Sequence, residues 1–261
     1  MILQGFVLIM LVVTLSSQRF QGPEKRIADG YPVANHIPWQ VSLSQNGSLL
    51  CGGVIYSERI VLTAAHCLYR VKIKDVSVRA GSLSWNSGGQ LVKIKSSVSH
   101  EKFNVTNLTN DIAVLFLSSS LKFDNFTRNV KLAKRTPEVG TPATVSGWGL
   151  TYYNPNGITP DKLHAVTVFV KDRKRCDKAY SKLTELLAED NIFFLEKDQI
   201  CASAFGAGSC LGDSGGPLVT TSPKRLIGIV SGSLRCLTPS VYSDVAVHKK
   251  WIENTVSCFC H

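Results

Sequence analysis

Residues Gly208 to Pro217 read Gly-Ser-Cys-Leu-Gly-Asp-Ser-Gly-Gly-Pro and place the hydroxyl of Ser214 in a glycine-rich turn. Glycine has no Cβ, so a turn of this composition lets the backbone approach another molecule closely. A serine hydroxyl is a weak nucleophile at neutral pH. It needs a base, a group that orients the base, and donors for the oxyanion. If Ser214 is a nucleophile, other parts of the chain must supply these groups.

The same turn also fits the pattern G-x-S-x-G over residues 212–216, which is the nucleophile elbow of α/β-hydrolases. That elbow requires a helix directly after the serine. Here Gly-Gly-Pro and the short apolar run Leu218-Val219 follow, which indicates a turn into a strand. The hydrolase triad also has the order serine, acid, histidine, whereas the candidate histidine of this chain lies far upstream. We therefore disfavour the elbow.

The candidate base is His66, in the segment Thr-Ala-Ala-His-Cys, where Cys67 can pin the loop to Cys51. A lone histidine is more often structural, so this setting is what singles His66 out. The candidate acid is Asp111, which precedes the apolar run of residues 112–117. A carboxylate at the edge of a buried run is costly unless it is paired. An imidazole partner would satisfy it.

Length and patterning predict one large all-β domain or two small lobes, since 261 residues supply ample core material. Many short apolar runs between turn signals favour an antiparallel sandwich or barrel over βαβ units. The helical period predicts two helices, at residues 176–190 and 247–256. The predicted strands are Trp39–Leu43, Ile60–Leu62, Val76–Val78, Leu91–Ile94, Ile112–Leu117, Ala143–Val145, Ala165–Val170, Leu226–Val230 and Val241–Val245.

The first residues predict export. The mostly apolar stretch of residues 1–15 is shorter than the roughly 20 residues of a membrane span, and small residues follow it, as at a signal-peptide cleavage site. The alternative is a buried N-terminal helix. Eight cysteines fit an oxidising compartment. We expect a signal peptide at residues 1–17 and a secreted, extracellular protein with no membrane span after cleavage. Glycosylation sequons begin at Asn46, Asn104, Asn107 and Asn125.

The formal net charge is +10, and the densest basic run is Lys171-Asp172-Arg173-Lys174-Arg175. The simplest interpretation of this run is a solvated loop. Attraction to an anionic surface or polysaccharide is the alternative. Neither interleaved aromatic residues nor a nucleic-acid-binding module accompanies the run, so we do not expect nucleic acid as a partner.

Four segments together resemble the chymotrypsin/trypsin family of serine endopeptidases, in identity and in order. They are Thr-Ala-Ala-His-Cys (63–67), Asp-Ile-Ala-Val-Leu (111–115), Ser-Gly-Trp-Gly (146–149) and Gly-Asp-Ser-Gly-Gly-Pro (212–217). The resemblance covers essentially all of residues 27–261. It implies an all-β fold of two six-stranded antiparallel β-barrels, at about 27–135 and 136–245, followed by a C-terminal helix at about 246–257.

The resemblance also implies a catalytic triad. Ser214 would be the nucleophile and His66 the general base and then the general acid, while Asp111 would orient His66. The N–H groups of Gly212 and Ser214 would form the oxyanion hole. Ser231 would help to orient Asp111 and would lie among the substrate-binding positions.

Family resemblance further implies synthesis as a zymogen with an activation propeptide at residues 18–26. Cleavage after Arg26 by a trypsin-like activating protease would free the amine of Ile27. That amine would pair with Asp213, beside the nucleophile, and order the oxyanion hole and the pocket. The family usually begins Ile-Val-Gly-Gly, so Ala28 and Asp29 depart from its pattern.

Three disulfides are implied by the same resemblance. Cys258 and Cys260, near the C-terminus, have no partner in this scheme. They either form a disulfide with another molecule or remain free thiols. The implied bridges are Cys51–Cys67, Cys176–Cys201 and Cys210–Cys236.

The family's pocket floor falls at Gly208, next to Ser209, with Ser233 and Ser240 on the walls. Trypsin-like members carry Asp at the floor, and a substrate cation in a dry pocket without a counter-charge is costly. We therefore predict a chymotrypsin- or elastase-like preference for apolar residues over Arg and Lys. Gly232 replaces a common Trp that helps to form the neighbouring subsites.

The expected partners are protein or peptide substrates, the activating protease and protein inhibitors, and we expect a monomer without cofactor or metal. The alternative is a catalytically inactive homologue that acts as a binding protein through its protease surface. Such homologues usually carry a substituted triad or a blocked oxyanion hole. His66, Asp111, Ser214 and Gly212 are all present here, so the enzymatic interpretation is favoured.

Overall fold

The computed structural model describes residues 30–154, 156–187, 195–205 and 207–259. The predicted signal peptide 1–17, the propeptide 18–26 with Arg26, and Ile27 lie outside these residues. So do the last three residues of the predicted helix 176–190, and Cys260.

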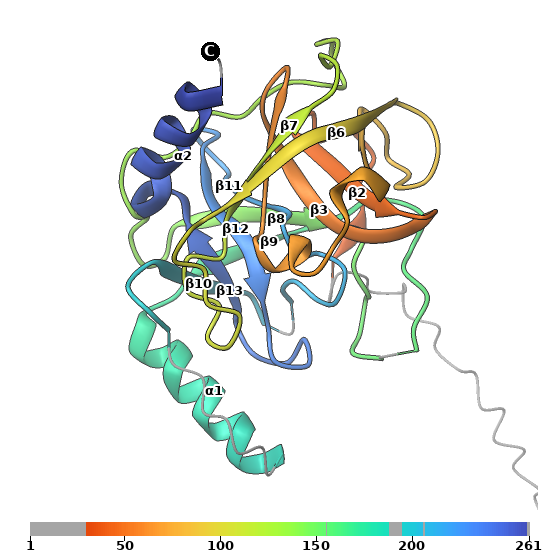
Figure 1. Cartoon of the computed structure of the whole chain (residues 1–261). Helices are drawn as coiled ribbons and strands as arrows, with labels where there is room; N and C mark the ends of the chain where they lie inside the picture. The colour runs from red at the N-terminus through yellow and green to blue at the C-terminus, as the bar shows by residue number, and fades with distance from the viewer. Residues whose placement is uncertain (1–29, 155, 188–194, 206, 260–261) are drawn as a thin grey trace, which may run out of the picture.

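The first barrel consists of six antiparallel strands from the N-terminal half of the chain (Figure 1). They close in the order β2-β3-β4-β7-β6-β5, with β5 paired back onto β2. Its core holds fully buried aliphatic side chains such as Val41, Leu43 and Leu62. The strands are β2 (Gln40–Gln45), β3 (Ser48–Ser57), β4 (Ile60–Thr63), β5 (Val76–Ala80), β6 (Gln90–Ser99) and β7 (Ala113–Leu117).

The second barrel also has six antiparallel strands, which close in the order β8-β9-β10-β13-β12-β11 and back to β8. The short strand β1 (Tyr31–Pro32) pairs with the first two residues of β9. The two barrels lie side by side, the first in warm colours and the second in green to blue (Figure 1). The strands are β8 (Pro142–Gly147), β9 (His164–Val170), β10 (Gln199–Ser203), β11 (Pro217–Thr220), β12 (Leu226–Gly232) and β13 (Ser240–Asp244).

Two helices accompany the barrels: α1 (Arg173–Leu187) and α2 (Val245–Phe259). Helix α1 begins three residues before the predicted start, because Asp172 caps it: its Oδ1 accepts the N–H of Arg175 at 3.2 Å. Helix α2 places Ile252 in the core of the first barrel, although it follows the last strand of the second. Within the described part of the chain, no helix has both the length and the apolarity that a membrane crossing requires.

A pair of glycines in β3 brings the two barrels into close contact. A Cβ on Gly53 would lie 2.8 Å from Val41 Cγ2, so the interior of the first barrel has no room for it. A Cβ on Gly52 would lie 3.0 Å from the Cα of Gly216, in the turn that follows Ser214. The glycine-rich turn of the second barrel therefore packs directly on β3 of the first.

Candidate active site

Asp111 lies at the entrance to β7 and is fully buried, and both of its carboxylate oxygens accept hydrogen bonds. Oδ2 is 2.7 Å from Nδ1 of His66 and 2.6 Å from the hydroxyl of Ser231. Oδ1 accepts the backbone N–H of His66 at 2.8 Å. Because a carboxylate only accepts, Nδ1 must carry the proton, and Nε2 of neutral His66 is left with a lone pair.

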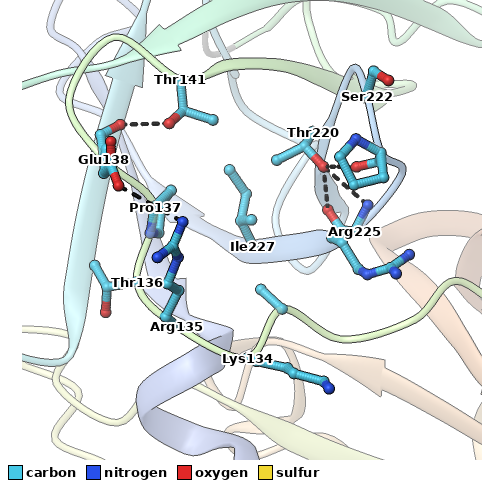
Figure 2. A pocket seen from close by; sticks show the side chains of 12 residues that line it. Lys134, Arg135, Thr136, Pro137, Glu138, Thr141, Thr220, Ser222, Arg225 and Ile227 are labelled. Atoms are coloured by element: carbon cyan, nitrogen blue, oxygen red, sulfur yellow. Dashed lines mark hydrogen bonds and ion pairs between the residues drawn. The ribbon is translucent and has the colours of Figure 1, made fainter.

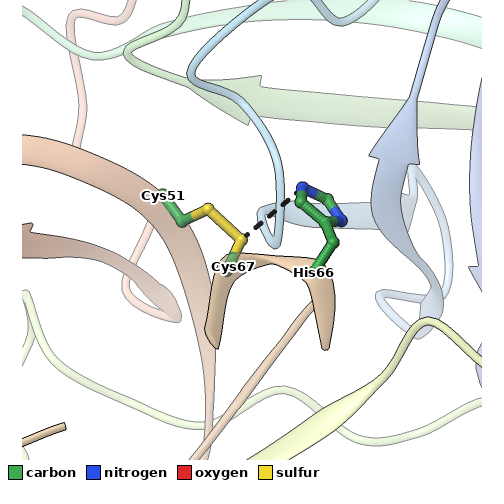
Figure 3. Close-up of side chains that lie close together, drawn as sticks. All are labelled: Cys51, His66 and Cys67. Atoms are coloured by element: carbon green, nitrogen blue, oxygen red, sulfur yellow. Dashed lines mark hydrogen bonds between the residues drawn. A yellow bond between two sulfur atoms is a disulfide. The ribbon is translucent and has the colours of Figure 1, made fainter. Parts of the chain in front are cut away.

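His66 begins the short 3₁₀ turn η1 (His66–Leu68), and the Cys51–Cys67 bridge ties that turn to β3. Figure 3 shows the imidazole beside this bridge, with its Nε2 atom 3.8 Å from Sγ of Cys67. About 24% of the His66 side chain is exposed, against none of Asp111, so the imidazole is the member of this pair that reaches the surface. Both sulfurs of this cluster are used in the disulfide, which leaves a single imidazole and no thiolate for a metal ion.

The turn that carries Ser214 packs against the first barrel and is hydrogen-bonded to it. The carbonyl oxygen of Ser214 accepts the N–H of Gly52 at 2.7 Å. Gly215 has a φ of +78°, and a Cβ there would collide with Thr63 Oγ1 and the carbonyl oxygen of Gly52. Thr63 is three residues before His66, so this packing sets the serine turn beside the histidine loop.

Ser214 is half-exposed. Within the described residues its hydroxyl makes no hydrogen bond. The hydrogen bond from Oγ to Nε2 of His66 that a triad requires is therefore not formed in this structure. Such contacts are often long in unliganded enzymes and tighten when substrate binds. The structure thus joins His66 and Asp111 directly and brings the Ser214 turn next to them.

Asp213 is completely buried, and its carboxylate contacts the Ser-Gly-Trp-Gly segment. Oδ1 accepts the N–H of Gly149 at 2.7 Å, and Oδ2 accepts the N–H of Cys210 at 2.9 Å. Burial raises the pKa of Asp213 to about 6, and these two hydrogen bonds offset only part of that rise. A Cβ on Gly147 or Gly149 would overlap the carboxylate, which explains both glycines. Among the described residues no cation pairs with it.

Gly212 has a φ of +97°, in the left-handed region that favours glycine. A Cβ there would lie 3.1 Å from the Cα of Gly149. Within the part of the chain that the structure covers, the N–H groups of Gly212 and Ser214 donate no hydrogen bond. The predicted oxyanion donors therefore have no competing partner there.

The four predicted pocket residues come together. The hydroxyl of Ser240 accepts the N–H of Ser209 at 2.7 Å, and the hydroxyl of Ser233 donates to the carbonyl oxygen of Ser209 at 3.0 Å. A Cβ on Gly208 would lie 2.8 Å from Ser240 Oγ. The segment predicted to form the pocket floor is thus packed closely against the hydroxyl groups of Ser233 and Ser240.

Tyr242 lies beside these predicted pocket residues, and the sequence analysis did not single it out. It is fully buried, and its hydroxyl lies near Ser240 and Ser209. Burial raises the pKa of this hydroxyl, which keeps it neutral. The period-two alternation of β13 is the signal that could have found it, because Tyr242 points to the same side of the strand as Ser240.

The structure contains the three disulfides that the resemblance implied: Cys51–Cys67, Cys176–Cys201 and Cys210–Cys236. The first braces His66, and the third joins the segment before Ser214 to the pocket wall. Cys258 lies on α2 with an exposed, free thiol.

The four sequon asparagines differ in exposure. Asn46, Asn104 and Asn125 are exposed, whereas Asn107 is half-buried. The amide oxygen of Asn107 accepts both the N–H and the hydroxyl of Thr109, at 3.2 and 2.9 Å.

A hollow of about 630 Å³ opens between the segment that connects the two barrels and the β11–β12 hairpin (Figure 2). Lys134, Arg135 and Arg225 line it, and Glu138 pairs with Arg135 at 3.7 Å. None of the predicted site residues lines this hollow.

Two closed barrels with a histidine–aspartate pair beside a glycine-flanked serine define the class of two-barrel serine endopeptidases. The family model described as Trypsin matches residues 27–252. The chain therefore belongs to the trypsin family of serine proteases and is a serine endopeptidase that acts on protein or peptide substrates.

Named relatives and a solved structure support the same family assignment. Trypsin alpha of Drosophila erecta is 42% identical over 224 residues, which cover 84% of this chain and 83% of that protein. Trypsin alpha-4 of Lucilia cuprina is 40% identical over 224 residues, with coverage of 84% and 83%. The structure of neuropsin, a serine protease expressed in the limbic system of mouse brain, is similar with a TM-score of 0.75 and 34% identity, and the match covers 87% of this chain and 99% of that one.

Proposed function

We propose that the protein is a secreted endopeptidase that works through a triad of Ser214, His66 and Asp111. The observation that carries this proposal is the convergence of His66 Nδ1 and Ser231 Oγ on the buried carboxylate of Asp111, at 2.7 and 2.6 Å. This arrangement fixes the imidazole so that Nε2 can accept a proton. It also stabilises the imidazolium that forms in the transition state.

In the proposed reaction Ser214 Oγ attacks the carbonyl carbon of the scissile peptide bond while Nε2 of His66 takes its proton. The N–H groups of Gly212 and Ser214 hold the resulting oxyanion, and one such donor is typically worth about 100- to 1,000-fold in rate. The intermediate collapses to an acyl-enzyme, and His66 gives the proton to the departing amine. Water then attacks the acyl-enzyme by the same route, with His66 again acting first as base and then as acid.

Activation would follow cleavage after Arg26, which separates the propeptide 18–26 from the peptidase domain 27–261. The buried, unpaired carboxylate of Asp213 supports this proposal, because a buried charge without a partner is costly. The freed amine of Ile27 would provide that partner. Pairing would hold the neighbouring turn in the conformation that presents Gly212 and Ser214 to substrate.

For the pocket, we propose a preference for apolar residues of chymotrypsin or elastase type. Relatives of this chain are named trypsins, but Gly208 supplies no carboxylate at the floor. Ser209, Ser240 and Tyr242 supply only neutral hydroxyls there. A neutral floor cannot compensate an Arg or Lys side chain that has lost its water.

Secretion is supported by the apolar leader, proposed as a signal peptide at residues 1–17, and by three disulfides, which form in oxidising compartments. Exposed sequon asparagines fit an exported glycoprotein. We expect a monomer that meets protein inhibitors as well as substrates.

One observation favours the second candidate, an inactive homologue that binds partners: the hydroxyl of Ser214 makes no hydrogen bond within the described residues. Labelling with an active-site-directed fluorophosphonate separates the two functions, because only an activated serine reacts. Protein matured after Arg26 should be labelled, while the Ser214→Ala variant and the uncleaved proenzyme should not. Matured, folded protein that takes up no label would identify the binding homologue.

A further inference from the structure

The segment that leads into Asp111 is held by a carboxylate of the second barrel. Asp198, just before β10, accepts the N–H of Asn110 on its Oδ2 atom at 2.6 Å. Asn110 has a φ of +51°, an uncommon conformation for a residue with a side chain. Because Asn110 directly precedes Asp111, this hydrogen bond fixes the direction in which the chain enters the buried carboxylate.

Asp198 is itself anchored from two sides. Its carbonyl oxygen accepts the N–H of Asp244 at 2.8 Å. Its Oδ2 lies 3.5 Å from Nε2 of His248, a buried side chain of α2. Burial alone would raise the pKa of Asp198, but the contacts with His248 and the N–H of Asn110 outweigh burial and lower that pKa. The carboxylate is therefore charged at neutral pH and accepts a charge-assisted hydrogen bond.

The next residue, Gln199, holds the same segment a few residues upstream. Its Nε2 donates to the carbonyl oxygen of Leu108 at 2.9 Å and to that of Asn107 at 3.3 Å. Gln199 is 1% exposed, so water cannot replace these contacts. Leu108 Cδ1 lies 3.6 Å from the place where a Cβ on Gly232 would be, next to the pocket strand β12.

We propose that Asp198 is a positioning residue for Asp111, and that Gln199 positions the cleft wall that Leu108 forms beside Gly232. This inference rests on the proposed function, because it takes Asp111 as the triad acid and Gly232 as part of the substrate cleft. Asp198 and Gln199, which are consecutive in the second barrel, then hold the segment of residues 107–111 in the first barrel, and each affects a different property of the enzyme. Asp198 acts on the chemical step through Asn110 and Asp111, whereas Gln199 acts on the binding of extended substrates through Leu108.

Steady-state kinetics of matured variants separate these two actions. Asp198→Ala leaves the N–H of Asn110 without its acceptor and should lower kcat by about 10- to 100-fold, because a misplacement of about 1 Å can cost about 100-fold. KM should stay within about twofold, since no cleft residue has changed. Asp198→Asn keeps an oxygen acceptor and should restore kcat to within about threefold of the parent.

Gln199→Leu should behave in the opposite way. It should raise KM for an extended peptide substrate by about five- to tenfold and leave kcat within about twofold, because a loose Leu108 weakens binding without moving Asp111. KM for a single-residue ester, which does not reach Leu108, should be unchanged. Asp161→Ala is the matched control, since this exposed carboxylate bonds only Ser84 among the described residues, at 2.6 Å, and both constants should match the parent.

A spectroscopic readout tests Asp198 independently of turnover. In Ser214→Ala protein the Nδ1 proton of His66, hydrogen-bonded to Asp111, should give a far-downfield proton resonance. Asp198→Ala should shift or broaden this resonance, and Asp161→Ala should not. If Asp198→Ala does not fold, Asp198→Ser, whose shorter side chain cannot reach the N–H of Asn110, takes its place.

An unchanged resonance together with an unchanged kcat in the Asp198 variant would overturn the proposal, as would equal losses of kcat in the Asp198 and Gln199 variants. An inactive parent enzyme would count against the proposed function alone, because the resonance would still report on Asp198 and Asp111.

Discussion

The hydroxyl of Ser231 lies 2.6 Å from Oδ2 of Asp111, although 120 residues separate them in the chain and they belong to different barrels. Ser243, also in the second barrel, donates its hydroxyl to the backbone carbonyl oxygen of Asp111 at 2.7 Å. The candidate triad acid is thus encoded in the first barrel but held in place by the second. The active site depends on how the two barrels pack as much as on the loops that carry it.

Replacing Ser231 by Ala should lower kcat by about tenfold or more, because a hydrogen bond to a buried charge is worth about 1.5–3 kcal/mol. The loss should appear in kcat rather than in KM, since the orientation of Asp111 matters in the transition state. Ser233→Ala, two residues further along the chain and just past the end of β12, is the control and should change KM more than kcat. An unchanged kcat in the Ser231 variant would contradict this prediction and show that the hydrogen bonds from His66 alone are enough to orient Asp111.

Asp213 should make the stability of the proenzyme fall as the pH rises. Its carboxyl has an ordinary pKa of 3.8, which the unfolded chain keeps, and a pKa of about 6 in the fold. Between these values the folded chain holds a proton that the unfolded chain has lost, so the free energy of unfolding falls by about 2 kcal/mol from pH 4 to pH 7. In the matured chain the amine of Ile27 should lower this pKa and remove the loss.

Urea unfolding at pH 4 and pH 7 checks this prediction. The proteins compared are an uncleavable Arg26→Gln proenzyme and matured protein, both carrying Ser214→Ala to prevent self-digestion. The Asp213→Asn proenzyme isolates the contribution of this one carboxyl. Equal pH dependence in the proenzyme and its Asp213→Asn variant would contradict the assignment.

Converting the pocket to accept Arg and Lys should require two changes. Gly208→Asp supplies the missing counter-charge, but its Cβ would lie 2.8 Å from Ser240 Oγ, which accepts the N–H of Ser209. The single variant should therefore lose activity on every substrate. The double variant Gly208→Asp with Ser240→Gly should gain at least about tenfold in kcat/KM on Arg substrates, because the buried cation is then compensated. No gain in the double variant would place the pocket floor elsewhere.

Of the two sequons in the loop before Asp111, the one at Asn104 should carry the glycan. Asn104 is exposed, whereas Asn107 is half-buried and its amide oxygen accepts two hydrogen bonds from Thr109. Intact mass spectrometry of protein secreted from eukaryotic cells should show one glycan fewer for Asn104→Gln and no change for Asn107→Gln. The reverse pattern would mean that the loop is glycosylated in another conformation.

The two-barrel fold was predicted correctly, and the triad residues could be proposed, because the four quoted segments are local and carry their chemistry in consecutive residues. Sequence reasoning identified strands such as β2 and β7 because their buried side chains are aliphatic. It missed β3 as a strand, because Gly52 and Gly53 interrupt the apolar pattern. Those glycines are required by close packing against Val41 and Gly216, which only the folded chain reveals.

Asp198 and Gln199 were missed for a related reason. Each acts through contacts with residues far away in the chain, and nothing in their immediate neighbours distinguishes them from ordinary residues of a strand or turn. The partners of Asp198 and Gln199 lie about 90 positions upstream. Such long-range hydrogen bonds depend on the relative placement of the two barrels, which no local pattern encodes.

The most direct test of the account is a mass-spectrometric cleavage profile against a diverse peptide mixture. The enzyme would be proenzyme matured by trypsin after Arg26 and then freed of trypsin, with the Ser214→Ala variant treated in the same way as control. We predict cleavage that is absent from the control and falls after Leu, Phe, Tyr, Met or smaller apolar residues. Cleavage after Arg and Lys would contradict the pocket assignment, and no cleavage by correctly matured, folded protein would contradict the proposed triad.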